Sequence, residues 1–454
     1  MRDWDPQQLA SAARADLLSP PGSGPGPEGA TIDSRQVGPG TLFVGLPGVS
    51  AHGGQFAAAA LAAGAYGILT DPEHARAVLR DAQRTGGAVL AAPDPLAALQ
   101  RLATAWRLHI GAHVIGVTGS TGKTSTKDLL LGVISPHRRT MASRANFNTE
   151  IGLPLEILAA PAETQVLILE MGMRGPGQIA ELGAIARPDV GIIVSLGPVH
   201  LELLGSMEAI AAAKAELIAA LPGGGTAIVP ADEPLLAPHL RDDVRTVTFG
   251  PGGDFQLRDE GADEVEIDAA GSSIRLQIDF AQAHLRRNLL AAVAAAQAVG
   301  VTPAGRVELA LSPGRGQQTA LPGGVILIDD CYNANPMSMR AALDDLVRVA
   351  APAGARRVAV LGDMLELGPD APSFHGEIGG YAAGRADLLV TVGPLAAEMG
   401  ERFVGAHQHA ESASEAAQFV PGLLHPGDVV LVKGSRGVAL EQVCHAVAAG
   451  TVAS

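Results

Sequence analysis

Residues 113–125 read HVIGVTGSTGKTS, an apolar run that leads through glycines into Lys123, Thr124 and Ser125. This order predicts a buried strand, a tight loop and the start of a helix. Glycines let backbone N–H groups turn toward phosphate oxygens, and the N-terminus of the helix adds partial positive charge. We therefore predict a phosphate-binding loop that is made of Gly119, Ser120, Thr121, Gly122, Lys123, Thr124 and Ser125.

Two residues of this loop have predicted roles of their own. Lys123 would reach the outer phosphates, and Thr124 would ligate magnesium. Val117 stands where the usual spacing has a first glycine, although Gly116 and Gly119 flank it. The alternative is a glycine-rich turn without a ligand, but the strand, the glycines, the lysine and the threonine together favour a phosphate site. Lys127 lies one turn further along the helix, where a solvated surface lysine is an equally good interpretation.

Short apolar runs alternate with alanine-rich segments along the whole chain. Such alternation predicts parallel strands joined by crossover helices, so the fold class is α/β. The runs fall into three sets, and each set predicts one sheet unit. The expected strands lie at 41–46, 66–70 and 87–92, then at 113–119, 165–172, 190–197 and 225–230, and last at 325–330, 357–363, 388–393 and 428–434.

The length of 454 residues supports three domains, because a single core rarely grows beyond about 250–300 residues. We place the boundaries near residues 108 and 313. The predicted domains are therefore 1–108, 109–312 and 313–454. Residues 19–29, SPPGSGPGPEG, are too rich in proline and glycine for regular structure and predict a loop inside the first domain.

Composition excludes several classes of protein. A formal net charge of −15 argues against a nucleic-acid partner, since proteins that bind a phosphate backbone usually present a basic face. The two cysteines, Cys331 and Cys444, give neither a disulfide framework nor a metal-ligand spacing. The longest apolar stretch, 56–69, is shorter than the ~18 residues of a membrane span and predicts a helix followed by a strand. We expect a soluble, cytoplasmic monomer without stable membrane insertion.

Scarce residue types mark candidate functional positions. The chain has four lysines, Lys123, Lys127, Lys214 and Lys433, among 32 cationic residues. Because arginine serves elsewhere, a retained lysine suggests a need for a compact, titratable ammonium group. Asparagine is equally rare, and the five are Asn146, Asn148, Asn288, Asn333 and Asn335.

Glu170 ends one predicted strand of the second set, and His200 follows another across a short loop. Residues at the carboxyl ends of parallel strands share one edge of a sheet, so we expect both beside the phosphate-binding loop, placed to hold a metal ion. Taken alone, each would more often be a surface residue.

Lys214 lies on the apolar side of its predicted helix, with Ile210, Leu217 and Ile218 three or four residues away. One interpretation is a lysine that extends from the edge of the apolar face into water. The other is a desolvated amine with a lowered pKa. Such an amine is neutral enough to be carbamylated into an anionic metal ligand.

The third set carries four polar clusters beside its strands. Any one of them would be weak evidence, because such loops often cap helices. Four in one domain indicate a ligand site. They comprise Arg315 in SPGRGQQ, Asp330, Asn333 and Asn335 in DDCYNANP, Gly362 and Asp363, and Lys433 and Arg436 in KGSR.

Several of these segments resemble the Mur ligases of peptidoglycan synthesis, and most closely those that add D-alanyl-D-alanine to UDP-N-acetylmuramoyl-tripeptide. The resemblance spans nearly the whole chain. Sister ligases that add a diamino acid carry an Asp-Asn-Pro-Arg motif, which is absent here. The matching segments are TGSTGKTS, NFNTEIGLPL, LEMGMRGPGQIAEL, ARPDVGIIVSLGPVHLELLGS, AKAEL, DDCYNANPMSMRAAL, LGDMLELG and LVKGSRG.

The resemblance implies a first domain that binds the UDP-sugar, a central P-loop ATPase-like domain and a C-terminal Rossmann-like domain that closes over ATP. It places Ser34 and Arg35 near the uridine diphosphate and implies that Asn146 and Asn148 contact substrate. The implied magnesium-organising residues are Thr124, Glu170, His200 and a carbamylated Lys214. Asn288 matches an adenine-binding position. The residues implied to close over ATP are Arg315, Asp330, Asn333 and Asn335. Those implied to lie near the dipeptide are Lys433 and Arg436.

Two departures from the family pattern stand out. Leu285 follows His284 where the family usually has asparagine. SAHGGQF at 50–56 replaces a tighter acidic-His-Phe pattern, which leaves His52 without an assigned role.

The implied reaction uses ATP and Mg²⁺: the tripeptide carboxylate attacks the γ-phosphate, and the D-alanyl-D-alanine amine then attacks the acyl phosphate. The catalytic residues would be Lys123, Glu170, His200, Lys214 and Arg315. Rival interpretations are another amide ligase of the same fold, such as a folylpolyglutamate synthase-like enzyme, or a nucleotide-hydrolysing switch. A guanine-specific switch is disfavoured because no Asn-Lys-x-Asp run exists in the chain.

Overall fold

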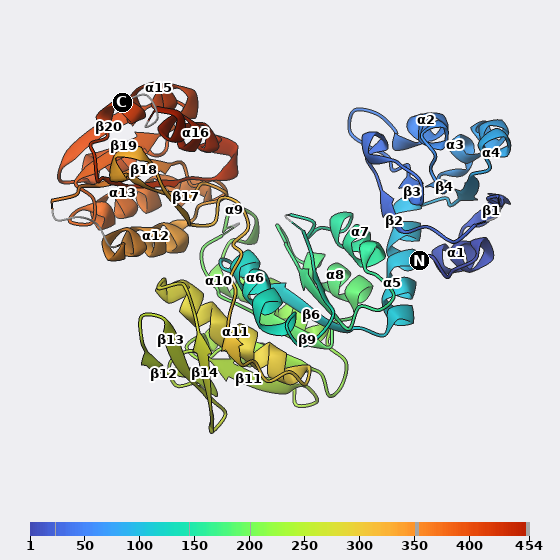
Figure 1. Cartoon of the computed structure of the whole chain (residues 1–454), viewed down its shortest axis with the longest axis horizontal. Helices are drawn as coiled ribbons and strands as arrows, with labels where there is room; N and C mark the ends of the chain where they lie inside the picture. Colours follow the sequence, from blue (N-terminus) through green and yellow to red (C-terminus); the bar gives the residue numbers. More distant parts are fainter. Residues whose placement is uncertain (23, 145, 200, 350–353, 451–454) are drawn as a thin grey trace.

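Three sheets follow one another along the sequence in the computed structural model, which describes residues 1–454 except 23, 145, 200, 350–353 and 451–454. Figure 1 shows the unit with the central sheet between the two others. The predicted boundaries near 108 and 313 fall between the strands of successive sheets and remain predictions. No helix in the described ranges is both long enough and apolar enough to cross a bilayer.

The N-terminal sheet has five strands in the order β1-β5-β4-β3-β2, and only β1 runs antiparallel to its neighbour. The predicted loop at 19–29 joins β1 to β2. Residues 56–69 form a helix and then a strand, as predicted. The elements are α1 (Pro6–Ala13), β1 (Asp16–Ser19), β2 (Gly29–Thr31), β3 (Thr41–Val44), α2 (Ala57–Ala62), β4 (Gly67–Thr70), α3 (Pro72–Ala77), α4 (Leu79–Thr85) and β5 (Ala88–Ala91).

The central sheet has ten strands in the order β15-β14-β13-β12-β11-β10-β9-β6-β8-β7. Parallel strands form one half of it. The four predicted ones are β6 (His113–Thr118), β8 (Val166–Glu170), β9 (Val190–Ile193) and β10 (Thr226–Pro230), whereas β7 (Thr140–Ala142) and β11 (Arg245–Phe249) were not expected. Its helices are α6 (Lys123–Ile134), α7 (Gly152–Ala159), α8 (Gln178–Ala186), α9 (Leu201–Leu204), α10 (Met207–Ala219) and α11 (Ala283–Ala298).

The other half of the central sheet was not predicted. Strands β12 (Phe255–Glu260), β13 (Glu264–Ala269) and β14 (Ser272–Gln277) pair antiparallel, and β15 (Gly305–Arg306) follows at the edge. Burial alternates along β13 and β14, because one face packs on the core and the other meets solvent.

The C-terminal sheet has six strands in the order β16-β17-β21-β18-β19-β20, and only β16 is antiparallel. The predicted strands of the third set are β17 (Ile326–Asp330), β18 (Arg357–Gly362), β19 (Leu388–Val392) and β21 (Val429–Lys433). The remaining elements are β16 (Gln317–Ala320), α12 (Pro336–Arg348), α13 (Ala371–Ala382), α14 (Ala397–Arg402), β20 (Ala406–Ala410), α15 (Ala413–Leu423) and α16 (Glu441–Gly450).

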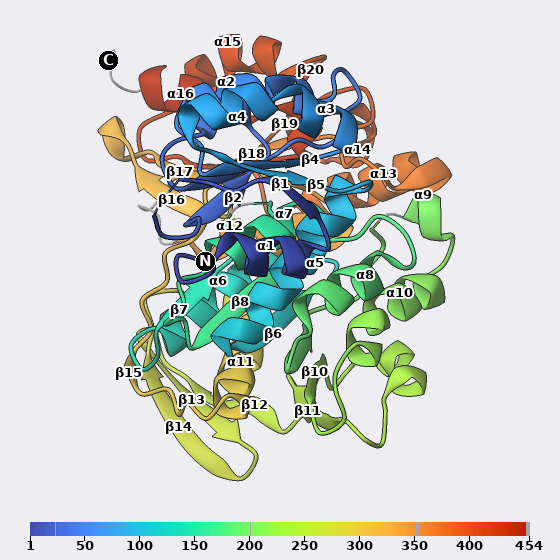
Figure 2. The same ribbon diagram turned by 90° about the vertical axis from the view of Figure 1, so that its right-hand side faces the viewer.

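Helix α5 (Pro95–Ile110) lies between the N-terminal and central sheets (Figure 2). Its fully buried Trp106 donates a hydrogen bond from Nε1 to the carbonyl of Ala160, 2.9 Å away, in the central unit. Arg107 binds the carboxylate of Asp189 at 2.8 Å. One hydrophobic cluster therefore runs from the N-terminal unit into the central unit.

Candidate active site

The predicted phosphate-binding loop joins β6 to α6 as the sequence indicates. Gly122 has a φ of +78°, and a Cβ there would lie 2.8 Å from Nδ2 of Asn288 on α11. Only glycine fits this conformation and this close approach. The ammonium group of Lys123 donates to the carbonyl of Gly119 at 2.8 Å, and Thr121 N–H donates to Ser195 Oγ at 2.9 Å. The end of β9 and helix α11 thus hold the loop in place.

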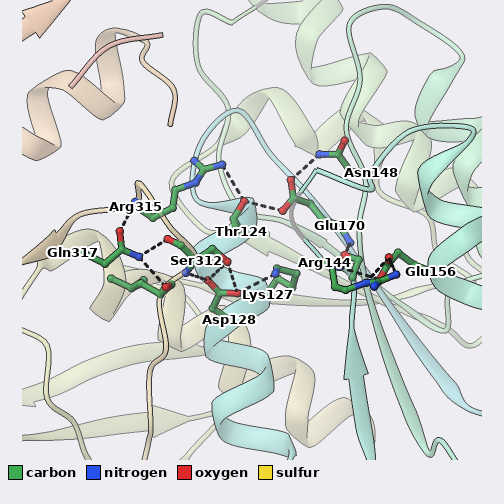
Figure 3. Close-up of polar contacts among 12 residues, drawn as sticks. Thr124, Lys127, Asp128, Arg144, Asn148, Glu156, Glu170, Ser312, Arg315 and Gln317 are labelled. Carbon is green, nitrogen blue, oxygen red and sulfur yellow. Dashed lines mark hydrogen bonds and ion pairs between the residues drawn. The ribbon is translucent and has the colours of Figure 1, made fainter. Parts of the chain in front are cut away.

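Glu170 ends β8 and is 3% exposed. Its carboxylate accepts hydrogen bonds from Thr124 Oγ1 at 2.8 Å and from Asn148 Nδ2 at 2.9 Å (Figure 3). Its backbone N–H donates to Ser143 Oγ at 3.0 Å, a contact that the sequence did not indicate. The structure therefore brings Glu170 to the phosphate-binding loop, as predicted.

Lys214 is 2% exposed within α10. Burial, and secondarily the positive charge of Lys123, holds the pKa of the Lys214 amine well below its ordinary value. The solvated interpretation of Lys214 is therefore wrong, and the desolvated one is confirmed. Burial also lowers the pKa of Lys123, while the charge of Glu170 opposes this shift and that of Arg315 adds to it. His200 lies outside the described residues.

The C-terminal unit faces this loop through Arg315, whose Nη2 donates to Thr124 Oγ1 at 3.1 Å. The guanidinium lies 3.9 Å from the centre of the Tyr332 ring. Tyr332 also contacts Arg436, whose guanidinium carbon lies 5.3 Å from the ring centre. Sequence reasoning missed Tyr332, although it is one of three tyrosines and stands inside the DDCYNANP run.

Asp330 and Lys433 are partners in register on β17 and β21, and their charged groups lie 2.6 Å apart. Lys433 also donates to the carbonyl of Asn333 at 3.0 Å. The side chain of Asn335 accepts from Ser338 N–H and caps α12, so it shapes the loop as well as facing the cavity.

A cavity of about 1040 Å³ opens between the central and C-terminal units. All the loop residues from Ser120 to Ser125 line it, whereas Ser34 and Arg35 do not. Arg35 instead holds the neighbouring Asp33, whose pKa it lowers to about 2. The other predicted site residues that line the cavity are Asn146, Asn148, Glu170, Asn288, Arg315, Asp330, Asn333, Asn335, Lys433 and Arg436.

Two expectations need correction. Lys127 is 5% exposed and lies 3.0 Å from the carboxylate of Asp128, so it is not a solvated surface lysine. Asp363 does not line the cavity; its carboxylate accepts from Ala396 N–H at 2.7 Å, and burial raises its pKa. That cluster fixes the loop before α14, because a buried carboxylate requires a hydrogen-bond donor.

His52 stacks on His74 with ring centres 4.2 Å apart, and Asp71 Oδ2 lies 3.4 Å from His52 Nε2 and 2.7 Å from His74 Nδ1. Gly54 N–H donates to His52 Nδ1 at 3.0 Å. This bond leaves the proton of the neutral ring on Nε2, pointing to Asp71. A metal bound at Nε2 would require a proton on Nδ1 and would break the Gly54 bond, so the cluster favours a structural role in the N-terminal unit.

Cys331 and Cys444 come together in space although they are far apart in sequence. Both thiols are free and buried, and Asp329 lies beside them. The hydrogen bond with Cys331, and then burial, raises the pKa of Cys444. A protonated thiol is a poor metal ligand and a poor nucleophile.

The phosphate-binding loop and the facing unit define a nucleotide-binding α/β protein of three units. Residues 28–107 match the "Mur ligase family, catalytic domain", residues 117–296 the "Mur ligase middle domain" and residues 314–436 the "Mur ligase, glutamate ligase domain". The chain belongs to the Mur ligase family.

Relatives match over most of their length. UDP-N-acetylmuramoyl-tripeptide--D-alanyl-D-alanine ligase of Bacillus subtilis is 34% identical over 96% of both chains. The ligase of that name from Mycobacterium tuberculosis H37Rv is 37% identical over 92% of this chain and 91% of its own.

Two solved structures also match over most of this chain. MurF from Acinetobacter baumannii has a TM-score of 0.85 and 28% identity, covering 98% of this chain and 99% of its own. MurF from Thermotoga maritima in complex with ADP has a TM-score of 0.80 and 28% identity, covering 93% of this chain and 97% of its own.

Proposed function

We propose that this enzyme is an ATP-dependent ligase that joins D-alanyl-D-alanine to the terminal carboxylate of UDP-N-acetylmuramoyl-tripeptide. The observation that carries the proposal is the match, over 96% of the chain, to a ligase of that name. The cavity geometry supports it, because a phosphate-binding loop faces cationic side chains of a second unit across one space.

The reaction would begin with attack of the tripeptide carboxylate on the γ-phosphate of ATP, which would break the bond to the β-phosphate, release ADP and form an acyl phosphate. Two unit charges 4 Å apart repel by about 4 kcal/mol at an effective dielectric of about 20. Lys123 and Arg315 lie where they would cancel this repulsion. The D-alanyl-D-alanine amine would then attack the acyl phosphate and release inorganic phosphate. Positioning and electrostatics supply most of the catalysis in such transfers.

A magnesium ion fits the residues at the loop. The Thr124 hydroxyl and the Glu170 carboxylate lie 2.8 Å apart and are the hard oxygen donors that Mg²⁺ prefers. A carbamate on Lys214 would add another anionic oxygen group. When bound, the ion would supply positive charge to the phosphate oxygens. His200 stays a predicted member of this site.

The remaining site residues take the roles that the family resemblance implies. Ser34 and Arg35 would bind uridine diphosphate, and Asn146 and Asn148 would contact the substrate. Asn288 would contact adenine. The residues Asp330, Asn333 and Asn335 would close over ATP, and Lys433 and Arg436 would lie near the dipeptide. We place the enzyme in the cytoplasm as a monomer.

Phosphate release by the purified enzyme tests the proposal. We expect release only when ATP, Mg²⁺, UDP-N-acetylmuramoyl-tripeptide and D-alanyl-D-alanine are all present. Release that does not depend on the dipeptide would contradict the proposal and favour a nucleotide-hydrolysing switch. Release that depends on glutamate or on a free diamino acid would favour another amide ligase of the same fold.

A further inference from the structure

The linker into the C-terminal unit, residues 311–317, is bonded directly to the helix of the phosphate-binding loop (Figure 3). Asp128 lies on α6, one turn beyond Thr124. Its Oδ2 accepts hydrogen bonds from Ser312 N–H at 2.9 Å and from Ser312 Oγ at 3.0 Å. The start of the linker is therefore fixed to the nucleotide-binding helix.

Lys127 completes this anchor. Its ammonium group lies 3.0 Å from Asp128 Oδ1, and the two residues are 5% and 8% exposed. A buried carboxylate is costly unless it is paired and hydrogen-bonded. The lysine neutralises Asp128 on one oxygen, and the other oxygen remains free to hold Ser312.

Gln317 folds the linker back on itself. Its Nε2 donates to the carbonyls of Leu311, at 2.8 Å, and Ser312, and its Oε1 accepts from Arg315 N–H at 3.1 Å. The far end of the linker is fixed as well, since Gln317 pairs with Asp329 on β17. Arg315 therefore sits in a short loop that is held at both ends.

The side chain of Arg315 spans the two units. It lies against the Tyr332 ring of the C-terminal unit and donates to Thr124 Oγ1 of the central unit. An arginine on an untethered loop would lose far more conformational freedom on meeting a phosphate. The anchor removes that cost before the nucleotide binds.

We propose that Asp128, Ser312 and Gln317 are positioning residues that hold Arg315 at the phosphate-binding loop, with Lys127 as the buried counter-charge. The inference rests on the proposed function for the role of Arg315 at the terminal phosphate. It assigns a role to Lys127 and names three residues that act through Arg315 without touching the reacting atoms.

A double-mutant cycle tests the proposal by the dissociation constant for a non-hydrolysable ATP analogue with Mg²⁺, measured by calorimetry. Asp128→Ala and Ser312→Ala should each weaken binding by about 5- to 20-fold when Arg315 is present, which lies within the range of couplings between residues in one network. In an Arg315→Ala background, each of these two substitutions should change the dissociation constant by less than about 2-fold. Ser312→Ala keeps the buried Lys127–Asp128 pair and decides the test if Asp128→Ala does not fold.

Asp254→Ala is the matched control. Asp254 Oδ2 accepts from the N–H and the hydroxyl of Thr248, both at 2.8 Å, at the connection from β11 to β12 of the central sheet. This substitution removes the same kind of clamp and should leave the affinity unchanged. Equal weakening in both Arg315 backgrounds, or no weakening by any linker variant, would overturn the proposal.

Catalysis provides an independent second measurement. Ser312→Ala should lower kcat for dipeptide-dependent phosphate release while the KM for UDP-N-acetylmuramoyl-tripeptide stays the same. The two measurements can separate the two proposals. If the effects of the linker variants depend on Arg315 but phosphate release does not depend on the dipeptide, the positioning role is supported and the proposed function is rejected. If the effects of the linker variants and of Arg315→Ala are additive but phosphate release requires the dipeptide, the proposed function is supported and the positioning role is rejected.

Discussion

Lys214 has a basic amine in a place that disfavours its charge. It is almost fully buried, and the nearby charge of Lys123 further lowers its pKa. A neutral amine can react with carbon dioxide to give a carbamate. The carbamate carries a negative charge, whereas an ordinary protonated lysine carries a positive one. A buried guanidinium stays protonated in proteins, so arginine cannot follow this chemistry.

We predict that Lys214→Arg lowers the rate of dipeptide-dependent phosphate release by about 100-fold or more, as loss of one preorganised electrostatic group does in other enzymes. The reason is that the positive charge is kept while the anionic oxygens are lost. The rate is measured with all substrates saturating, and circular dichroism checks that the variant is folded. Turnover close to that of the unsubstituted enzyme would remove the carbamate role.

At the scale of single residues, the sequence predicted some functional lysines correctly and missed the role of another. The rarity of lysine pointed to Lys123, Lys214 and Lys433, and all three are at or near the cavity. The same rarity did not reveal that Lys127 pairs with Asp128, because the sequence does not show that this part of α6 is buried.

At the scale of elements, the strand, loop and helix at 113–134 depend on one glycine conformation. Gly122 has positive φ, and Asn288 and Val194 fill the space that a side chain would need, with atoms at 2.8 and 3.0 Å from a Cβ. The turn into α6 thus depends on a helix more than 150 residues further along the sequence.

We predict that Gly122→Ala weakens binding of the non-hydrolysable ATP analogue by at least about 10-fold, since the left-handed conformation costs about 1–2 kcal/mol and the new methyl group would displace Asn288. Calorimetry measures the affinity.

Gly111→Ala is the control for this element. Gly111 also has positive φ, at +63°, but nothing lies within 4 Å of a Cβ there. The Gly111→Ala variant should lose about as much folding stability as Gly122→Ala, but its affinity for the ATP analogue should be unchanged. Equal affinities of the two variants would show that the close approach of Asn288 is unimportant.

Elements differed in how well the sequence predicted them. The central parallel strands, such as β6, β8, β19 and β21, are continuous apolar runs because both of their faces are buried, and these were predicted. The parallel strands β2, β7, β11 and β20 were not predicted, because they are short or partly exposed. Strands β13 and β14 alternate polar and apolar residues around a turn at Ala270 and Gly271, a signal that was available in EVEIDAAGSSIRLQ but was not used.

At the scale of the whole molecule, two segments connect the three sheet units in different ways: α5 and the linker at 311–317. Trp106 and Arg107 attach the N-terminal unit to the central unit through buried contacts. The linker attaches the C-terminal unit beside the nucleotide-binding helix. The first joint therefore stabilises the molecule, and the second one shapes the cavity.

We predict that Trp106→Phe lowers the free energy of unfolding of the joined N-terminal and central units by about 1–3 kcal/mol, because the buried carbonyl of Ala160 loses its donor. Urea unfolding followed by circular dichroism measures the change. The affinity for the ATP analogue should stay the same, since Trp106 does not line the cavity.

Trp4→Phe is the control for this joint. Trp4 packs edge-on against Trp106 with ring centres 5.4 Å apart, and in the described part of the chain its indole N–H donates to no residue. It should cost less stability than Trp106→Phe. A larger loss from Trp4→Phe would contradict the importance of the Ala160 bond.

The sequence by itself determined the α/β class, the three sheet units, the phosphate-binding loop and a minority of the residues that line the cavity. Those features follow from local patterns: apolar runs, glycine spacing and polar residues at strand ends. Tertiary structure decided which strand-end clusters face the cavity, since Asp363 and Asp330 follow similar strands yet only Asp330 lines it. It also decided the partners of Tyr332 and Ser312, because contacts between residues far apart in sequence depend on how the units pack together.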